Sequence, residues 1–352
     1  MDLNKWKFID SKLKNPERVI SLLKAIQPVN EDTEKERMFS NYEYEPCFEY
    51  NPLPFDTKEE EERLKSIHIP EGYFNKLFED KRQEKLLLNK MKEAAGSDRF
   101  KELSVELYGK QKNSVFEEAR KNLDIYREEE FEPKTISFDE LEKRFEQRLF
   151  EYGLNDWNVK LSDRKNVTVH SSKKAIYVPK RDYGQEEMEK LLLHENDCHV
   201  LRAANGYKQP LPEVFSTGLT NFTETEEGLA FYLQELNGLM PVESIVKMSV
   251  NVLTIDNMLN DEPFKKTFCM LKDYGFDDEF AWNRTVRAYR GGGLTKDHLY
   301  ASGIDKLRRF HQAGNDLAKL YIGKISLHDL EWIEPLINAD VIKLPTYLPK
   351  LA

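Results

Sequence analysis

The sequence predicts an α+β fold that is mainly helical and contains one small antiparallel sheet. Apolar residues recur at helical spacing along most of the 352 residues. Three short runs rich in β-branched and aromatic residues follow one another between residues 157 and 178. A helical segment with two histidines comes shortly after these runs, so we expect the sheet to pack beside that helix.

The length predicts about two structural units, at roughly 150 residues per domain. The best boundary is the acidic, proline-containing stretch at residues 128–134. We therefore expect a helical region over residues 1–134 and a second region over residues 135–352 that carries the functional site.

The first region is expected to be helical over residues 12–26, 71–95 and 101–126, where apolar residues recur every three or four positions. Residues 41–56 are rich in Pro, Tyr and Asn and are expected to be extended or irregular. The run KEEEERLK at residues 58–65 predicts the solvated face of a helix.

The second region begins with a capping box, in which Ser137 precedes Glu140 by three residues, and this first helix should end at Gly153. Three strands should follow at residues 157–161, 167–170 and 175–178, arranged as a meander. A helix should then run over residues 185–204 and stop at Asn205-Gly206. Another should run from Thr223 to residues 237–238, and the rest should be mostly helical, broken by three glycines at residues 291–293.

Composition excludes several classes of protein. The chain has 53 Lys and Arg against 63 Asp and Glu, a net charge of −10, which argues against a general nucleic-acid binder. No apolar run reaches the length of a membrane helix or of a signal peptide. The three scattered cysteines, Cys47, Cys198 and Cys269, form no disulfide framework, so we expect a cytoplasmic protein. From the charge and the apolar runs we expect neither a nucleic-acid partner nor a membrane partner.

A histidine pair marks the candidate site. His194-Glu195-x-x-x-His199 places two imidazoles and a carboxylate on one helix, which suits a zinc hydrolase. On a regular α-helix residues five apart point about 140° away from each other, so the two imidazoles could not readily share a metal. A π-type bulge would bring them together.

A third ligand is expected at the start of the helix that begins at Thr223. Glu224, Glu226 and Glu227 are competing choices on spacing alone. Gly228 beside them would allow close packing against the histidine-bearing helix, since a glycine inside a helix usually has a packing reason.

Three motifs follow in order: HENDCHVLRAANG at residues 194–206, TEEGLA at 225–230 and RGGGLTKD at 290–297. Together they resemble the microtubule-associated tyrosine carboxypeptidase family, whose bacterial members carry a QEGLA motif. The resemblance implies a zinc metallopeptidase with a gluzincin-like core that removes a C-terminal residue, notably the terminal tyrosine of α-tubulin in animals. Carried over by position, it implies zinc held by His194, His199 and Glu227, with Glu195 as general base. The family's glutamine is Glu226 here, which adds a negative charge.

A carboxypeptidase also needs a cation for the free carboxylate of its substrate, a role in which Arg pairs best. We expect the substrate-binding residues among Arg202, Arg290, Lys296, Tyr300, His170 and Tyr177. Tyr289 is a further possible oxyanion donor. A basic segment at residues 164–181 could offset the acidity of the chain if the substrate is an acidic tubulin tail. The expected partner is thus a protein or peptide C-terminus, tubulin included.

Two other interpretations remain. An endopeptidase or aminopeptidase could use the same scaffold, with a different charge facing the substrate. A non-catalytic cytoskeletal or regulatory binding protein is the alternative outside the enzymes. The joint presence of His194, Glu195, His199 and Glu227 argues against it, because an adaptor does not need all four.

Overall fold

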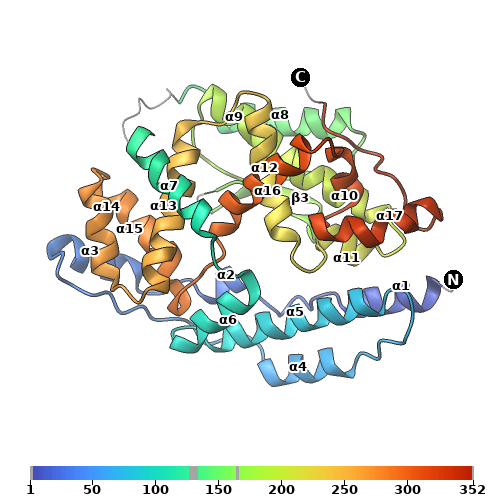
Figure 1. The fold of residues 1–352 in the computed structure, drawn as a ribbon, viewed down its shortest axis with the longest axis horizontal. Coiled ribbons are helices and arrows are strands. Elements are labelled where there is room, and N and C mark those ends of the chain that lie inside the picture. The colour runs from blue at the N-terminus through green and yellow to red at the C-terminus, as the bar shows by residue number, and fades with distance from the viewer. Residues whose placement is uncertain (1–2, 127–133, 164–165, 351–352) are drawn as a thin grey trace. The chain divides into compact units, whose positions relative to one another are not determined.

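A computed structural model of the chain describes residues 3–126, 134–163 and 166–350. The predicted boundary at residues 128–134 therefore lies almost wholly outside the described residues, and the division at residue 134 remains a prediction. Helices dominate and are accompanied by one small sheet (Figure 1). None of the described helices is both long enough and apolar enough to span a bilayer.

The chain forms two compact units, each built from separate stretches of sequence. The first unit comprises Met1–Lys12, Glu130–Pro241 and Gly303–Ala352, and the second comprises Leu13–Glu129 and Val242–Ser302. The division falls within helix α16 (His298–Gln312).

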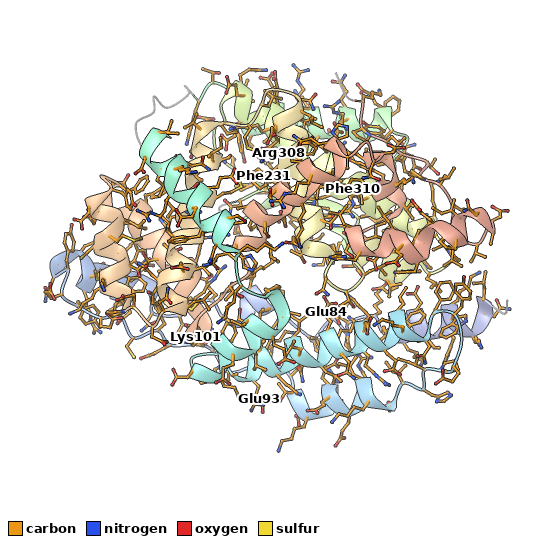
Figure 2. The ribbon with its side chains drawn as sticks, viewed as in Figure 1. Glu84, Glu93, Lys101, Phe231, Arg308 and Phe310 are labelled. Carbon is orange, nitrogen blue, oxygen red and sulfur yellow. The ribbon has the colours of Figure 1, made fainter. Side chains whose placement is uncertain are left out.

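The first unit contains the sheet and the histidine-bearing helix. Its elements are α1 (Leu3–Lys12), α8 (Phe138–Glu151), β1 (Asn158–Ser162), β2 (Thr168–His170), η1 (Ser171–Lys173), β3 (Ala175–Pro179), α9 (Gln185–Leu191), η2 (Leu192–Val200), α10 (Leu201–Tyr207), α11 (Pro212–Thr217), α12 (Phe222–Leu236), most of α16, η4 (Leu317–Ile322), η5 (Leu327–Asp329) and α17 (Leu330–Asn338). Arg308 of α16, labelled in Figure 2, forms an ion pair with Glu235 of α12.

Within its described residues, the second unit contains helices and connecting segments but no strand. Its elements are α2 (Leu22–Ala25), α3 (Glu31–Ser40), α4 (Thr57–Ser66), α5 (Asn75–Glu93), α6 (Asp98–Tyr108), α7 (Asn113–Tyr126), α13 (Val242–Leu259), α14 (Phe264–Asp273), α15 (Asp278–Tyr289) and η3 (Arg290–Gly292). Its core gathers around the fully buried rings of Phe268 and Trp282. Helix α4 runs alongside α5, as Figure 1 shows.

The strands occur where the sequence predicts them, but the sheet is mixed. The order is β1-β3-β2, with β2 antiparallel and β1 parallel to β3, so the prediction of an antiparallel meander is wrong for β1. The most apolar run, AIYVP, takes the centre, where Ala175, Ile176 and Val178 are fully buried. Strand β2 contacts η2, as expected for a sheet beside the histidine-bearing helix.

Several predicted helices are confirmed and others are corrected. Helices α5 and α8 form as predicted, and Ser137 Oγ accepts the Glu140 N–H. Residues 12–26 do not form one helix, because the chain leaves α1 and turns near Pro16 before α2. The stretch 101–126 is two helices, broken where Gly109 adopts a positive φ of 76°.

Asn205-Gly206 does not end its helix, because both residues lie inside α10. Gly206 lies so close to α11 that an added Cβ would be 2.2 Å from the Phe215 carbonyl oxygen. A contact between helices, and not a helix end, therefore explains this glycine.

Candidate metal centre

The histidine-bearing segment is π-helical. Residues Leu192–Val200 form η2, between the α-helical turns of α9 and α10. A π-helix closes hydrogen bonds between residues five apart, so such residues lie above one another. The rings of His194 and His199 accordingly lie with their centroids 4.8 Å apart. The bulge that the spacing requires is present, although it is longer than one residue.

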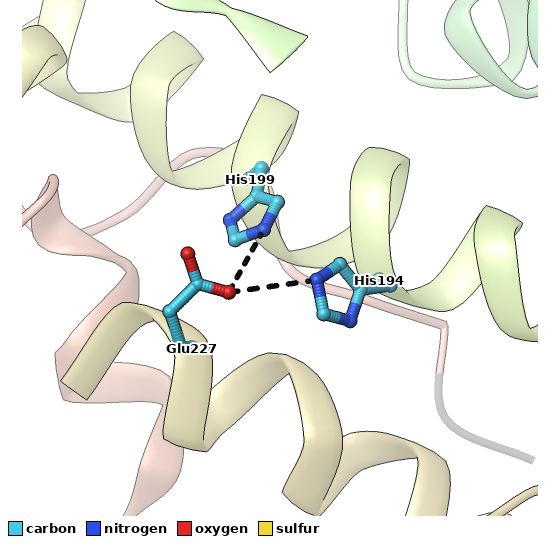
Figure 3. A group of neighbouring side chains, drawn as sticks. All are labelled: His194, His199 and Glu227. Atoms are coloured by element: carbon cyan, nitrogen blue, oxygen red, sulfur yellow. Dashed lines mark ion pairs between the residues drawn. The ribbon is translucent and has the colours of Figure 1, made fainter. Parts of the chain in front are cut away.

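Glu227 completes a group of three ligand atoms. Its Oε2 lies 3.7 Å from His194 Nε2 and 3.9 Å from His199 Nε2 (Figure 3). In a tetrahedral zinc site with bonds of about 2.0–2.1 Å, neighbouring ligand atoms lie about 3.4 Å apart. All three ligand atoms lie within 4.8 Å of one another, so side-chain rotations would bring them to this spacing. Two imidazoles and one carboxylate, only 11–17% exposed, therefore fit a zinc ion.

The three competing glutamates are separated by their partners. Glu224 pairs with Lys306 of α16 at 2.5 Å, and Glu226 faces the far side of the His199 ring. Of the three, only Glu227 faces both Nε2 atoms.

Carboxylates give the centre a negative field. Burial lowers the pKa of His194, but Glu227, Glu195 and Glu226 outweigh it and raise that pKa above its usual value. The same field that attracts a proton attracts a metal cation.

Glu195 carries a carboxyl group with raised proton affinity. It is 7% exposed, and its burial raises its pKa despite the opposing effect of His194 and His199. Within the described residues its carboxylate has no hydrogen-bond partner. A buried carboxylate without hydrogen-bond partners, next to the candidate metal ligands, is suited to accept a proton from water.

Glu226 fixes the orientation of His199. One carboxylate oxygen lies 2.8 Å from His199 Nδ1 and accepts a hydrogen bond from Lys324 Nζ at 2.6 Å, while the other accepts from Arg202. Burial alone would raise the pKa of Glu226, but Lys324, Arg202 and His199 hold it well below its usual range. A carboxylate on Nδ1 keeps the proton there and leaves Nε2 free for a metal.

Arg202 is not a substrate-binding residue, contrary to the prediction. Its side chain is fully buried and its guanidinium donates to Glu226 and to the carbonyl oxygens of Leu320 and Ile325. No donor surface remains for a substrate carboxylate. Its role is to hold Glu226.

Aromatic and polar side chains surround the two histidines. Phe231 of α12, labelled in Figure 2, lies edge-on to the His194 ring with centroids 4.9 Å apart. Gln234 of α12 lies 3.4 Å from His194 Nδ1. On the neighbouring sheet, the rings of His170 and Tyr177 are in edge contact at 4.7 Å. Both are partly exposed, and a role in substrate binding remains a prediction.

Arg290, Lys296 and Tyr300 belong to the second unit. Lys296 Nζ lies 5.7 Å from the centre of the Tyr300 ring, and Arg290 is half-buried next to the glycine turn. Their roles in substrate binding also remain predictions. Tyr289 does not offer a free hydroxyl, because it donates to the Glu262 carbonyl and contacts Thr267.

The basic segment at residues 164–181 is partly neutralised. Residues 164 and 165 lie outside the described residues. Lys174 pairs with Asp156 at 2.5 Å, and Arg181 pairs with Glu187 at 2.6 Å. The part of this segment that the structure describes therefore offers less free positive charge than its sequence indicates.

Sequence reasoning missed the partners that hold the ligands. Lys324 lies 98 positions after Glu226, and nothing in the local sequence connects the two. The sequence offers Glu226 as a competing ligand and as an added negative charge, and its place directly before Glu227 is the only local sign of a supporting role.

The fold and the site define a class of mainly helical proteins. In this class a π-helix carries two histidines, and a second helix brings a glutamate to them. Residues 36–352 match the family model described as microtubule-associated tyrosine carboxypeptidase. The chain belongs to this family, which confirms the resemblance of its motifs.

Individual relatives are distant and longer. The chain is 25% identical to the rat protein named microtubule-associated tyrosine carboxypeptidase 1 over 346 residues, which cover 94% of this chain and 65% of that protein. It is 27% identical to the human protein of that name over 196 residues, or 53% of this chain and 41% of that protein. It is 25% identical to a mouse protein named putative tyrosine carboxypeptidase over 357 residues, which cover 94% of this chain and 59% of that protein. The chain thus spans less than two-thirds of these relatives.

Proposed function

We propose that this chain is a zinc-dependent carboxypeptidase that removes the last residue of a protein or peptide. The observation that carries the proposal is the convergence of His194, His199 and Glu227 beside a buried Glu195. His₂Glu is a common donor set of catalytic zinc sites, which leave one position open. The carboxylate on His199 Nδ1 is the support that such ligands usually have.

When bound, zinc would supply Lewis acidity and lower the pKa of a water at the site. Glu195 accepts the proton of the attacking water and later delivers it to the leaving amine. Glu226, held by Lys324 and Arg202, keeps His199 in one tautomer and one orientation. Phe231 limits the movement of His194 by packing against its ring.

The names of the relatives guide the choice of substrate. They indicate a C-terminal tyrosine and a microtubule protein. We propose a protein tail with a free carboxylate, of the tubulin type, and a cytoplasmic site of action. The net charge of −10 opposes docking of a strongly acidic tail, so a shorter or less acidic tail is a useful second substrate.

The test combines metal analysis with a panel of peptides that differ in their last residue. The wild-type protein should contain about one zinc and release the C-terminal residue. Glu195→Gln should keep the zinc and lose about 10²–10⁴-fold in kcat. Glu189→Gln is the matched control, because this exposed glutamate lies on α9 of the same continuous helix. Its activity should be unchanged.

Modified peptides separate the alternatives. An amidated C-terminus should block a carboxypeptidase and leave an endopeptidase active, whereas acetylation of the N-terminus should block only an aminopeptidase. Zinc-loaded protein that cleaves none of the peptides would favour a binding protein. Protein that purifies without zinc and regains no activity with it would contradict the proposal.

A further inference from the structure

Three arginines form a row at the C-terminal end of α15 in the second unit. Arg284 and Arg287 lie on α15 and Arg290 follows directly after it, so the three are spaced three residues apart. Arg284 and Arg287 are therefore neighbours on the helix surface. Arg290 lies just beyond the helix and is close enough to interact electrostatically with both. Asp297, which follows the glycine turn, reaches this row and accepts a hydrogen bond from Arg287 Nε at 2.7 Å.

Asp297 is the carboxylate that these cations share. It is 4% exposed, and burial alone would raise its pKa. Arg287, Arg290 and Lys296 instead lower its pKa to about 2, so Asp297 is charged. Its ion pair is with Arg287. One carboxylate therefore faces four cationic side chains, counting Arg284.

Arg284 and Arg290 lack ion pairs. Within the described residues neither comes within 4 Å of a carboxylate. Glu243 acts on Arg284 and Glu31 acts on Arg290 only from a longer distance. Glu243 is itself paired with Lys247.

Within the described residues, one nitrogen of each of these two guanidinium groups also lacks a hydrogen-bond partner. The Nε atoms of both Arg284 and Arg290 are buried without one. Arg284 has only a weak contact of 3.5 Å to Asn251 Oδ1 and the Phe280 ring at 5.5 Å. Burial lowers the pKa of Arg284 to about 10, and repulsion from Arg287 adds to this effect. Buried polar groups are normally paired, so these unpaired donors require an explanation.

The helix dipole does not explain these unpaired arginine donors. The C-terminus of α15 carries about half a negative charge, and this effect acts within the last turn. Arg284 lies before that turn, and half a charge cannot balance the arginines that remain unpaired. An anionic ligand with several acceptor atoms would balance them.

We propose that Arg284, Arg287 and Arg290 form an oxyanion-binding site, with Lys296 at its edge. The planar guanidinium forks suit carboxylate and phosphate, which accept two hydrogen bonds side by side. The ligand is a peptide carboxylate or a phosphate group. The site lies within the second unit and does not depend on the proposed hydrolytic activity.

Binding can be measured by titrating the zinc-loaded full chain with inorganic phosphate and, separately, with an amidated glutamate-rich peptide. Each titration is compared with sodium chloride at equal ionic strength, since chloride measures general screening. The wild-type protein should show saturable binding of at least one ligand by calorimetry. Binding of the peptide alone would identify carboxylate, and binding of phosphate alone would identify phosphate.

The variants Arg284→Gln and Arg290→Gln should each weaken this binding at least 10-fold. Arg120→Gln is the matched control, because this exposed arginine of α7 belongs to the same unit. It should bind as the wild type does. Arg290→Lys keeps the positive charge but loses the planar guanidinium, so it should bind the anion with intermediate affinity. This variant tests the proposal if a glutamine variant fails to fold.

Equal binding by the wild type and by Arg290→Lys would overturn the proposal. So would a response to both ligands that chloride reproduces at the same ionic strength. If Glu195→Gln loses peptide cleavage but still binds the anion, the oxyanion site is independent of the proposed hydrolytic activity.

Discussion

Glu226 shows how one buried side chain can orient a proposed metal ligand, because it contacts the far side of the His199 ring. It is 2% exposed and binds His199, Arg202 and Lys324. Burying three charges is costly unless they compensate one another. The two cations compensate this carboxylate, and in return it aligns the imidazole. Because the three residues form one network, a change in one of them should affect the others.

Glu226→Gln should weaken both the fold and the metal centre. An amide oxygen can still accept from His199, but Arg202 and Lys324 lose their buried counter-charge. We expect a loss of about 3–5 kcal/mol in the free energy of unfolding and about 10–100-fold in zinc affinity. Urea denaturation and competition with a coloured chelator measure the two effects.

Two further variants sharpen this test. Glu224→Gln breaks a partly exposed pair with Lys306 and should cost less than about 1 kcal/mol. Adding Lys324→Met to Glu226→Gln removes one uncompensated cation and should restore part of the lost stability. Unchanged zinc affinity in Glu226→Gln would refute the positioning role.

At the level of elements, the site depends on how α12 is held. Gly228, next to Glu227, was expected to pack against the histidine-bearing helix. It packs instead against α16, where an added Cβ would lie 2.4 Å from the Gly303 carbonyl carbon. The prediction that Gly228 allows close helix packing is confirmed, but the helix that it contacts is α16 and not the histidine-bearing helix. This close contact of α12 and α16 fixes the position of Glu227.

Gly228→Ala should push these helices apart. Overpacking of this kind costs about 1–3 kcal/mol, and the displaced Glu227 should bind zinc more weakly. Thermal unfolding and zinc titration provide the measurements. Gly314→Ala is the control, because its Cβ would meet open space while its φ of 82° imposes strain. It should lose about 1 kcal/mol and keep its zinc affinity. Equal zinc affinity in both variants would contradict the prediction.

At the level of the whole chain, the first unit joins segments that are far apart in sequence. Helix α1 is tied to α11 by Asp10, whose carboxylate accepts the N–H groups of Glu213 and Val214 at 2.8 and 2.9 Å. Asp10 is 2% exposed. Burial raises its pKa to about 6, although the two N–H groups oppose this effect.

This pKa predicts a pH dependence of stability. Because the folded protein binds the Asp10 proton more tightly than the unfolded chain, its contribution to stability is full below pH 4 and is lost as the pH rises through 6. The total is about 3 kcal/mol, at about 1.4 kcal/mol for each unit of pKa. Asp10→Asn cannot titrate and should lack this loss.

Urea denaturation of the metal-free wild type and variant between pH 4 and pH 7 measures the effect. The wild type should lose stability relative to Asp10→Asn over this range. A difference between the two that stays constant with pH would refute the assignment.

Much of the local structure follows from the sequence. Periodicity located α5, a capping box located α8, and composition located the three strands. The HExxxH spacing required a departure from the α-helix, which η2 provides. These features depend on residues within a few turns of one another, and short-range geometry constrains them strongly. The three ordered motifs also sufficed to recognise the family.

Tertiary structure decided the rest. It brings Glu227 within 4 Å of both histidine Nε2 atoms. It also buries Arg202 and Lys324 against Glu226 and places β3 at the centre of the sheet. Apart from the place of β3, each of these outcomes depends on a partner 24 to 118 residues away in the chain. Local spacing carries no information about such partners, because they meet only when the helices and strands pack together.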